Sequence, residues 1–542
     1  MSPTKGGKRI DRLPHVLSAL VTLIVFGVYL MTLSPGVSWA HHSEDSGDLI
    51  TAAWVLGIPH PTGYPLFCIV GWIWTHLLPF GSVAWRMNAL SALWGALASG
   101  ITLRAIWRGF SLLPDDTLNW MGLRTRALAS LSGALLLAFS LYVWEQSVVT
   151  EVYSLNLFFF SAVSWILIEL LAGSREQDNA WELRRSRLVA LLGLTWGFAL
   201  TNHMTSLFLF PSIFTVLAFG GLGFKPRELA RAALFWFLPL LLYAYLPIRS
   251  RMDPPLDYGN PETWDGFVWM VTGKQFRRSM FSLLPYQSLH QIMRYNSLPL
   301  QLGAFGAFLS GLGLIKLLIE KSRHITLLML HSVLLVAVSL FFLASYSIWD
   351  PEGYILPMIW SAALWASWSV SLAAELPPKL GPPVKTAVIM LLAVAPLFSL
   401  VAHYNEVDLS DNYEAIRFGE ESFDAFEPNA LVIEVRYERA FVFWYYREVE
   451  YADSRRDVAI VYIEHTGFQW GLDLLKRKYP DLVIPDKPLG GKNPDAATAA
   501  WIVRHNIDKR PIYVGATIDE LKKEGYKFQA VGLLFRVFPP DG

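Results

Sequence analysis

The sequence predicts an α-helical protein that crosses a membrane about eleven times and ends in a soluble α/β domain. Of its 542 residues, 53% are hydrophobic and only 17% are charged, whereas soluble domains are about a quarter charged. Apolar runs long enough to span a bilayer recur as far as residue 403,. From residue 404 onward, short β-rich runs alternate with helical stretches, which is typical of a small α/β domain,.

The first apolar run, LSALVTLIVFGVYLMTL, follows a basic N-terminus and is not followed by a small-residue cleavage site. We therefore expect a retained first span with the N-terminus in the cytoplasm. Basic loops further along the chain set the orientation of the other spans and place the C-terminus outside. The segment 63–80, GYPLFCIVGWIWTHLLPF, is short and predicts an interfacial or re-entrant helix,. The expected spans lie near residues 14–34, 85–107, 126–144, 152–171, 188–203, 205–221, 231–247, 299–319, 325–345, 354–374 and 386–403.

Two domains follow from this pattern, a transmembrane domain over residues 1–403 and an extracytoplasmic soluble domain over residues 404–542. Within the first, residues 41–80 and 249–298 are expected to be outer loops. The formal net charge is zero, which argues against general nucleic-acid binding,. The soluble tail has no GxGxxG or GxxxxGK[ST] motif, so nucleotide binding has no support,. A single cysteine, Cys68, excludes an intramolecular disulfide,.

Three acids lie just outside the first span, in the stretch HHSEDSGDL, where Glu44, Asp45 and Asp48 stand close in sequence. In a structural interpretation, Asp45 is the N-cap and Asp48 the N3 residue of a helix GDLITAAWVL. In a functional one, ionisable groups at a membrane edge are costly and usually have a task. A carboxylate here could act as general base for a hydroxyl nucleophile.

A divalent metal is a third interpretation of the same stretch. Histidines and acids that could ligate it are His41, His42, Glu44, Asp45 and His60. No HxxxH or HExxH spacing supports such a site, so a divalent metal stays an unsupported alternative and no cofactor is assigned.

Further polar side chains fall on the same predicted outer face. Any one of them is more typical of a turn or a helix cap, but their convergence on one face favours a site. Basic residues on that face could bind lipid headgroups nonspecifically or clamp a phosphate with charge-assisted bonds. The acids, amides and histidines are Glu145, Glu151, Asn202, His203, Asp350 and Glu352, and the basic residues are Arg249, Lys274, Arg277 and Arg278.

A carboxylate base, a cationic clamp and a membrane-accessible face suit sugar transfer from a polyprenyl-phosphate donor. The phosphate leaving group departs without protonation when cations stabilise it. One carboxylate then suffices, whereas a glycosidase uses a second carboxyl group as general acid.

The motifs of this sequence resemble those of the GT-C class of membrane glycosyltransferases. The resemblance is to the bacterial relatives of a eukaryotic transmembrane protein O-mannosyltransferase, and it covers roughly residues 15–360. The family pattern is Asp-x-Gly-Glu followed by His-Pro-Pro-Gly-x-Pro-Leu. This chain has Asp45-Ser46-Gly47-Asp48 and His60-Pro61-Thr62-Gly63-Tyr64-Pro65-Leu66. Further matches are TEVYSLN (150–156), LTNH (200–203), YLPIRSRMDPPLDYGNPETWDGF (245–267) and VTGKQFRRSMF (271–281).

The resemblance implies an inverting transfer of a hexose, such as mannose, from a polyprenyl-phosphate donor at the outer face of a bacterial plasma membrane. It implies that Asp45 or Asp48 is the catalytic base, and Asp45 is favoured because Asp48 is one methylene shorter than the family's glutamate. The acceptor hydroxyl, on a protein, a glycan or a lipid, is left open. The expected substrate-binding residues are Glu44, His60, Tyr64, Glu151, Tyr153, Asn202, His203, Arg249, Lys274, Arg277 and Arg278.

Two other functions would use similar features. A transporter or flippase of lipid-linked sugars would explain the spans and the basic loop, but it predicts inverted repeats and broken helices near the midplane. The sequence shows no such repeat. An oligosaccharide ligase or polymerase that uses a pyrophosphate-linked glycan would have a similar site, and the sequence alone does not separate it from a monosaccharide transferase.

Overall fold

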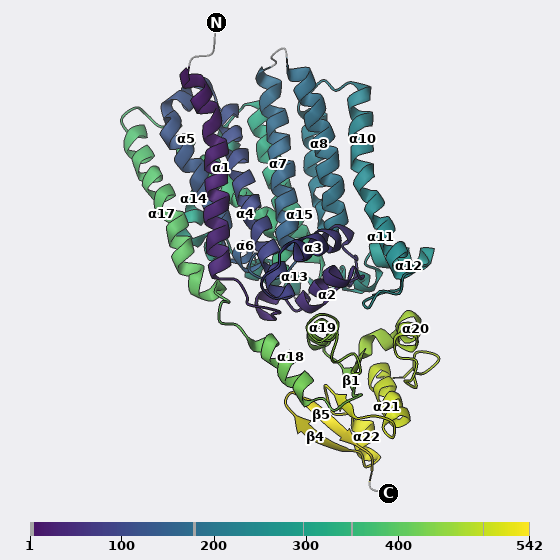
Figure 1. The fold of residues 1–542 in the computed structure, drawn as a ribbon. Coiled ribbons are helices and arrows are strands. Elements are labelled where there is room, and N and C mark those ends of the chain that lie inside the picture. The colour runs from purple at the N-terminus through teal and green to yellow at the C-terminus, as the bar shows by residue number, and fades with distance from the viewer. Residues whose placement is uncertain (1–4, 177–179, 296, 348–350, 492, 541–542) are drawn as a thin grey trace.

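The structure is a computed structural model that describes residues 5–176, 180–295, 297–347, 351–491 and 493–540. Long helices run side by side in a bundle, with the N-terminus at one end and an α/β domain attached at the other (Figure 1). Among the described residues, eight helices are long and apolar enough to cross a membrane. They cover Arg12–Met31, Val83–Leu112, Tyr153–Arg175, Pro226–Ser250, Leu298–Ile319, Arg323–Ser345, Leu356–Glu375 and Gly381–Val407. The predicted fold class, a polytopic helical membrane protein with a C-terminal α/β domain, is confirmed.

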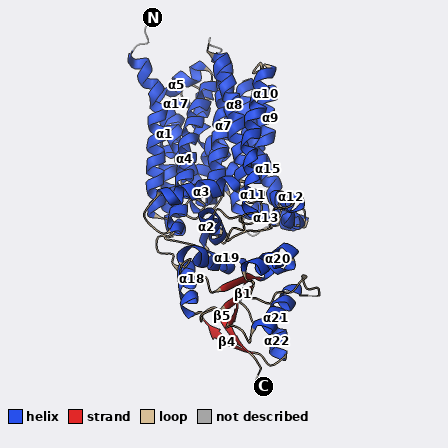
Figure 2. Ribbon diagram, turned by 45° about the vertical axis from the view of Figure 1, so that its right-hand side comes forward, coloured by secondary structure: helices blue, strands red, loops and turns tan. Residues whose placement is uncertain are grey.

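Three of the eleven expected spans correspond to helices outside that set of eight. Helices α5 (Asp115–Ala138) and α8 (Trp181–Asn202) lie in the bundle beside the eight apolar helices (Figure 2). The third, expected at 205–221, consists of the short helices η3 (Met204–Leu209) and α9 (Phe210–Phe219). The 3-10 helix η3 leads directly into α9, and Pro211 lies in the first turn of α9, where a proline is tolerated,.

The other helices of the bundle and its lower end have these bounds: α1 (Lys5–Met31), α2 (Ser46–Val55), α3 (Pro65–Leu77), α4 (Val83–Gly109), α6 (Leu141–Glu145), α7 (Tyr153–Glu176), α10 (Pro226–Leu240), α11 (Tyr245–Ser250), α12 (Trp264–Val271), α13 (Pro285–Tyr295), α14 (Leu298–Ile319), α15 (Arg323–Ser345), α16 (Leu356–Leu372) and α17 (Gly381–Val407). The short α2, α3, α12 and α13 gather at the end of the bundle that faces the α/β domain (Figure 1). The segment predicted to be an interfacial helix folds as α3.

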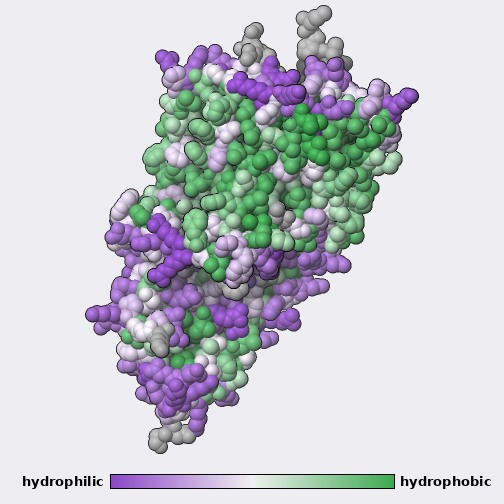
Figure 3. All heavy atoms as spheres, turned by 180° about the vertical axis from the view of Figure 1, so that it is seen from behind, coloured by the Kyte–Doolittle hydropathy of each residue, from purple (hydrophilic) through white to green (hydrophobic). Residues whose placement is uncertain are grey.

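On the face seen in Figure 3, a broad apolar surface covers the bundle, while hydrophilic side chains cover its two ends and much of the α/β domain. Large apolar side chains of the bundle are exposed in the isolated chain, among them Leu23 on α1, Phe237 on α10 and Val401 on α17. In a bilayer these side chains face lipid, because hydrocarbon removes the cost of exposing them. The protein is an integral membrane protein.

The C-terminal domain is built on a five-stranded sheet in the order β2-β1-β3-β5-β4. Strands β1 (Leu431–Glu434), β2 (Ala459–Tyr462) and β3 (Ile512–Val514) are parallel, and β5 (Leu534–Phe538) pairs antiparallel with β3 and with β4 (Lys527–Val531). Helix α18 (Glu414–Ala425) precedes the sheet. The connections carry α19 (Tyr437–Tyr445) after β1, α20 (Gln469–Lys478) and α21 (Pro494–Asn506) after β2, and α22 (Asp519–Lys523) after β3.

The α/β domain packs directly on the loop that carries the three acids. A Cβ atom at Gly47 of α2 would stand 2.4 Å from the carbonyl oxygen of Phe441 in α19, so this approach requires glycine. The Trp39 indole donates to the carbonyl of Glu438 at 3.1 Å. Lys478 at the end of α20 donates to the carbonyl of Pro255, in the loop 249–298, at 2.8 Å. The soluble domain therefore covers both segments that the sequence analysis assigned to the site.

Candidate active site

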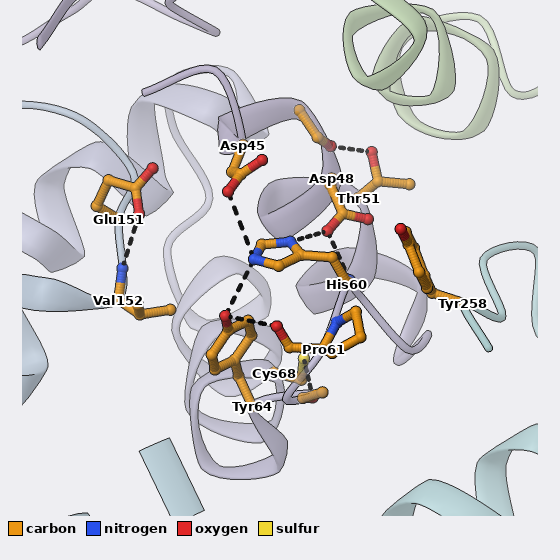
Figure 4. Close-up of polar contacts among 12 residues, drawn as sticks. Asp45, Asp48, Thr51, His60, Pro61, Tyr64, Cys68, Glu151, Val152 and Tyr258 are labelled. Carbon is orange, nitrogen blue, oxygen red and sulfur yellow. Dashed lines mark hydrogen bonds and ion pairs between the residues drawn. The ribbon is translucent and has the colours of Figure 1, made fainter. Parts of the chain in front are cut away.

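Asp48 and His60 form the centre of a polar cluster at the start of α2 (Figure 4). Asp48 lies in the first turn of that helix and its side chain is completely buried. Its Oδ2 accepts from the backbone N–H of His60 at 2.9 Å and lies 2.7 Å from Nδ1 of the same residue. Two contacts to one carboxylate oxygen fix both the backbone and the ring of His60.

The second nitrogen of His60 faces the other acid and a phenol. Nε2 lies 3.4 Å from Asp45 Oδ2 and 3.0 Å from the Tyr64 hydroxyl. That hydroxyl donates to the carbonyl of Pro61 at 3.0 Å. His60 thus links the buried acid to Asp45, which the sequence analysis favoured as base.

Asp45 occupies the N-cap position of α2, but its side chain makes no capping hydrogen bond. The capping interpretation of Asp45 is therefore wrong for its carboxylate, which instead turns toward His60. About 31% of the side chain is exposed. Burial of the group raises the pKa of Asp45 above its ordinary value, His60 opposes that rise, and the carboxylate of Asp48 adds to it,. A carboxylate of raised pKa, partly open to a cavity, is suited to accept a proton.

Asp45, His60 and Tyr64 line the polar end of a cavity of about 430 Å³. Most of the cavity wall is apolar or aromatic and comes from helices of the bundle. Such a combination of few polar groups with an apolar wall is typical of a ligand pocket. The remaining wall residues are Pro61, Thr62, Tyr153, His203, Met204, Thr205, Leu207, Phe208, Thr272, Gly273, Phe276, Arg277, Met280, Val338, Phe341, Phe342, Tyr346 and Tyr354.

Aromatic rings from separate motifs meet beside the polar end. The ring of His203 stacks on that of Tyr64, with centroids 5.8 Å apart, and lies 5.4 Å from that of Tyr153. His203 Nδ1 lies 2.7 Å from the Thr205 hydroxyl, which holds the imidazole in place. The sequence analysis predicted that Tyr64, Tyr153 and His203 would share a site, and the structure brings them together in this cavity.

Glu151 and Asn202 lie behind the cavity and do not line it. Both are buried, and both bond to the backbone of Val152: Glu151 accepts from its N–H at 3.3 Å and Asn202 donates to its carbonyl at 3.1 Å. They hold the turn before Tyr153, which is the start of α7. Their part in a site is therefore to support the side chains that line it.

The basic residues of the loop 249–298 lie in different environments. Lys274, Arg277 and Arg278 are all exposed on one short helix, η5 (Lys274–Ser279), and of the three only Arg277 lines the cavity. Arg249 donates to the carbonyls of Leu56 and Val55 at 2.7 and 3.3 Å. Its guanidinium thus caps the C-terminal end of α2 and does not line the cavity.

The remaining polar side chains named from the sequence lie around this centre. Glu44 is partly exposed next to Asp45, and burial raises the pKa of its carboxyl. His41 Nδ1 lies 3.4 Å from Glu145 Oε1, away from the cavity wall. Asp350 falls outside the described residues. Among those that are described, no three or more of the histidines, cysteines and acids are grouped so that they could hold a metal ion.

Some cavity residues were missed by the sequence analysis, notably Tyr354, Thr272 and Phe276. Tyr354 stands in SIWDPEGY, a stretch that was noticed for its acids, and its ring centroid is 5.8 Å from that of Tyr153. Thr272 and Phe276 flank the Gly-Lys-Gln of VTGKQF. The only signal in the sequence was that these residues are aromatic or small and polar. Such residues are also common in ordinary protein cores, so the signal does not identify a cavity wall.

The fold and the cavity define this chain as a membrane protein of the GT-C fold. Its structure is similar to that of ArnT from Cupriavidus metallidurans bound to undecaprenyl phosphate, with a TM-score of 0.60, 14% sequence identity, and 96% and 97% of the two chains covered. At this identity the likeness shows the fold.

More particularly, residues 45–222 match the family model of the protein O-mannosyl-transferase TMEM260 N-terminal domain. The chain is 31% identical over 255 residues to the mouse protein O-mannosyl-transferase TMEM260, covering 46% of this chain. It is 24% identical over 561 residues to the Dictyostelium discoideum protein O-mannosyl-transferase tmem260, covering 94% of this chain. The matches span 33% and 65% of those relatives. The resemblance inferred from the acid loop and the His-Pro-x-Gly-Tyr-Pro-Leu motif is confirmed.

Proposed function

We propose that this protein is a glycosyltransferase that moves a hexose from a polyprenyl-phosphate donor to an acceptor hydroxyl. The observation that carries the proposal is the cavity itself, in which a partly exposed carboxylate of raised pKa stands at the polar end of an apolar channel. Asp45 supplies the base, Arg277 the cation, and Phe208, Phe341 and Phe342 an apolar wall for the lipid chain.

The reaction follows from these positions. Asp45 takes the proton of the acceptor hydroxyl while its oxygen attacks the anomeric carbon of the sugar. The bond between that carbon and the phosphate oxygen breaks, and its electron pair stays on the phosphate. Arg277 stabilises the charge that develops there, so no acid is needed to protonate the leaving group. Attack from the face opposite the phosphate inverts the anomeric configuration.

His60 and Asp48 act as positioning residues in this scheme. His60 keeps Nε2 against Asp45 and the Tyr64 hydroxyl, and Asp48 keeps His60 in that orientation. Asp48 lines no part of the cavity and is completely buried, so it has no access to an acceptor. We therefore assign the proton transfer to Asp45.

The identity of the substrates rests on the relatives. The two curated relatives carry the name protein O-mannosyl-transferase, which supports mannose as the sugar and a protein hydroxyl as the acceptor. The ArnT neighbour bound to undecaprenyl phosphate supports a polyprenyl-phosphate donor. The basic N-terminus supports a cytoplasmic N-terminal end, with the cavity and the α/β domain at the outer face of the membrane.

The proposal is tested with the purified full-length protein in detergent. It is incubated with polyprenyl-phosphate mannose, radiolabelled in the sugar, and with a serine- and threonine-rich peptide. We expect label to move to the peptide in a form released by β-elimination. Absence of transfer to peptide, glycan and lipid acceptors alike, with the protein folded, would refute the proposal. A parallel reaction with a pyrophosphate-linked oligosaccharide separates a ligase from a monosaccharide transferase.

A further inference from the structure

His203 places a hydrogen-bond donor of fixed orientation in the wall of the cavity that holds Asp45. It directly follows the last residue of α8, is 7% exposed and lines the cavity. Its Nδ1 accepts from the backbone N–H of Thr205 at 3.2 Å, so this nitrogen carries no proton. The imidazole is therefore neutral, and its one N–H hydrogen is on Nε2.

Neighbouring side chains keep this tautomer in place. The Thr205 hydroxyl lies 2.7 Å from Nδ1 and accepts from the Asn156 amide nitrogen at 2.7 Å, so its own hydrogen is free to meet Nδ1. Ser206 donates to the oxygen of the same amide at 2.8 Å, which fixes the amide's orientation. Because every member of this network is buried, Nε2 is held as a donor before any ligand arrives,.

Nε2 has no hydrogen-bond partner among the residues that the structure describes. It is not one of the completely buried polar atoms, and His203 lines the cavity, so the nitrogen is accessible from there. Donors in such surroundings are normally paired, and an unpaired one costs free energy. This N–H therefore calls for an acceptor atom on a ligand in the cavity.

Aromatic rings stand around His203 next to the polar end of the cavity. The Tyr64 ring is parallel to the imidazole within 3°, and the rings of Tyr153 and Tyr354 lie 5.4 and 5.9 Å from it, centroid to centroid. The Tyr64 hydroxyl lies 3.0 Å from Nε2 of His60, the residue that positions the proposed base (Figure 4). Only the Tyr64 ring thus separates His203 from the proton-transfer residues.

The proposed reaction brings three chemical groups into this one cavity. The acceptor hydroxyl lies at Asp45, the phosphate lies at Arg277, and the sugar lies between them. A hexose presents hydroxyl oxygens at its edge and C–H groups on its faces, which suit a single N–H donor among aromatic rings. The charged phosphate is better matched by the guanidinium than by a neutral imidazole. The sugar is therefore the ligand that His203 fits best.

We propose that His203 recognises the donor sugar, with Nε2–H donating to one hydroxyl oxygen of the hexose. This inference rests on the proposed function and adds a specificity-determining residue to it. A site built to bond a hydroxyl strongly rejects an analogue that lacks it, because the donor in the site is then left unpaired. His203 thus selects among polyprenyl-phosphate sugars by the presence and position of that hydroxyl.

The test compares polyprenyl-phosphate mannose with analogues that each lack a different one of its hydroxyls. The full-length protein is used in detergent. Donor binding is measured as the rise in unfolding temperature, and transfer is measured as kcat/KM with a serine- and threonine-rich peptide. We expect one deoxy donor to have a kcat/KM at least about 100-fold below that of mannose, and to raise the unfolding temperature less.

Two variants and a matched control locate the effect. His203→Phe keeps a flat ring against Tyr64 but has no N–H, and His203→Ala removes the ring as well. Both should use the parent donor and the critical deoxy donor equally well, within about threefold. His290→Phe changes an exposed histidine of α13 that does not line the cavity, and it should keep the full discrimination. The ratio compares two donors in one protein, so a general loss of stability cancels.

The outcomes separate this inference from the proposed function. Equal use of all donors by the wild type would overturn the inference even though sugar is transferred. Discrimination that survives in both His203 variants would also overturn it, because Nε2 would then meet the phosphate or the acceptor. Binding that depends on one hydroxyl and on His203, without transfer to any acceptor, would support the sugar contact and count against the proposed function alone. No binding of any donor would overturn both.

Discussion

Asp48 Oδ2 holds His60 by two contacts, one to the backbone N–H at 2.9 Å and one to Nδ1 at 2.7 Å. The acid is completely buried and the histidine connects it to Asp45. Asp48, in the first turn of α2, therefore fixes the His60 imidazole. The orientation of this imidazole in turn positions the Asp45 carboxylate. Of the two acids of the motif, Asp45 lines the cavity, and Asp48 holds the histidine beside it.

The first prediction concerns His60 as a positioning residue. His60→Gln keeps a donor for Asp48 but loses the rigid link to Asp45. We expect kcat to fall about 100-fold, because misplacement of a reacting group by an ångström costs that much. The acceptor KM should change little. His76→Gln, at an exposed histidine of α3 outside the cavity wall, is the control and should leave kcat unchanged. Equal effects of the two substitutions would contradict the role of His60.

The pH dependence of transfer should report on Asp45. Burial raises the pKa of this carboxyl, so the base is protonated and inactive at acidic pH and becomes active as the pH rises through the raised value,. The acid limb of kcat/KM should therefore have its midpoint above about 4, the ordinary value for aspartate. Because His60 lowers the pKa of Asp45, the midpoint should move to higher pH in His60→Gln. A profile that stays flat down to about pH 4 would argue against Asp45 as the base.

Arg277 and Arg278 offer a matched pair for the cationic clamp. They are adjacent on η5, but only Arg277 lines the cavity. Arg277→Gln should raise the donor KM about tenfold through the loss of a charge-assisted bond to phosphate, and it should also lower kcat. Arg278→Gln, measured in the same detergent, should change the donor KM less than about twofold. If the two variants bind donor equally well, the phosphate does not lie at Arg277.

Asp257 links the stability of the interface between the domains to pH. It is fully buried in the loop 249–298, accepts from the Ser250 hydroxyl at 3.0 Å and lies 3.8 Å from Arg477 of α20. Burial raises its pKa to about 7, and the hydrogen bond from Ser250 and the charge of Arg477 oppose the rise.

The raised pKa fixes the sign of the effect. The folded state binds the proton more tightly than the unfolded chain, so this stabilisation is complete below about pH 4 and is lost as the pH rises to about 7,. We expect thermal unfolding of the wild type to move to lower temperature between about pH 5 and pH 7, by an amount equivalent to about 2 kcal/mol. In Asp257→Asn, the unfolding temperature should no longer fall in this way between about pH 5 and pH 7. A fall as large as that of the wild type would contradict the role of Asp257.

The sequence could predict much of the fold, since the apolar runs and the positions of the basic loops are local features. It could also predict that Asp45, His60, Tyr64, Tyr153 and His203 share a site. It could not predict that the Asp45 carboxylate makes no capping hydrogen bond. That carboxylate faces His60, which comes fifteen positions later in the chain.

The roles of Arg249 and Gly47 depend on contacts between distant segments. Arg249 binds carbonyls at the end of α2, where Leu56 adopts a left-handed conformation. Gly47 allows α19 to approach within contact of α2, from a domain nearly 400 residues later in the chain. Periodicity and local motifs carry no information about such pairings.

The most direct test of the central claim is the rate of sugar transfer by Asp45→Asn. Asparagine has the same size as aspartate and can keep its place beside His60. It cannot take a proton from the acceptor. The account predicts a loss of at least about 1,000-fold in kcat, with donor binding and the unfolding temperature close to those of the wild type. Transfer within about tenfold of the wild-type rate would contradict Asp45 as the base.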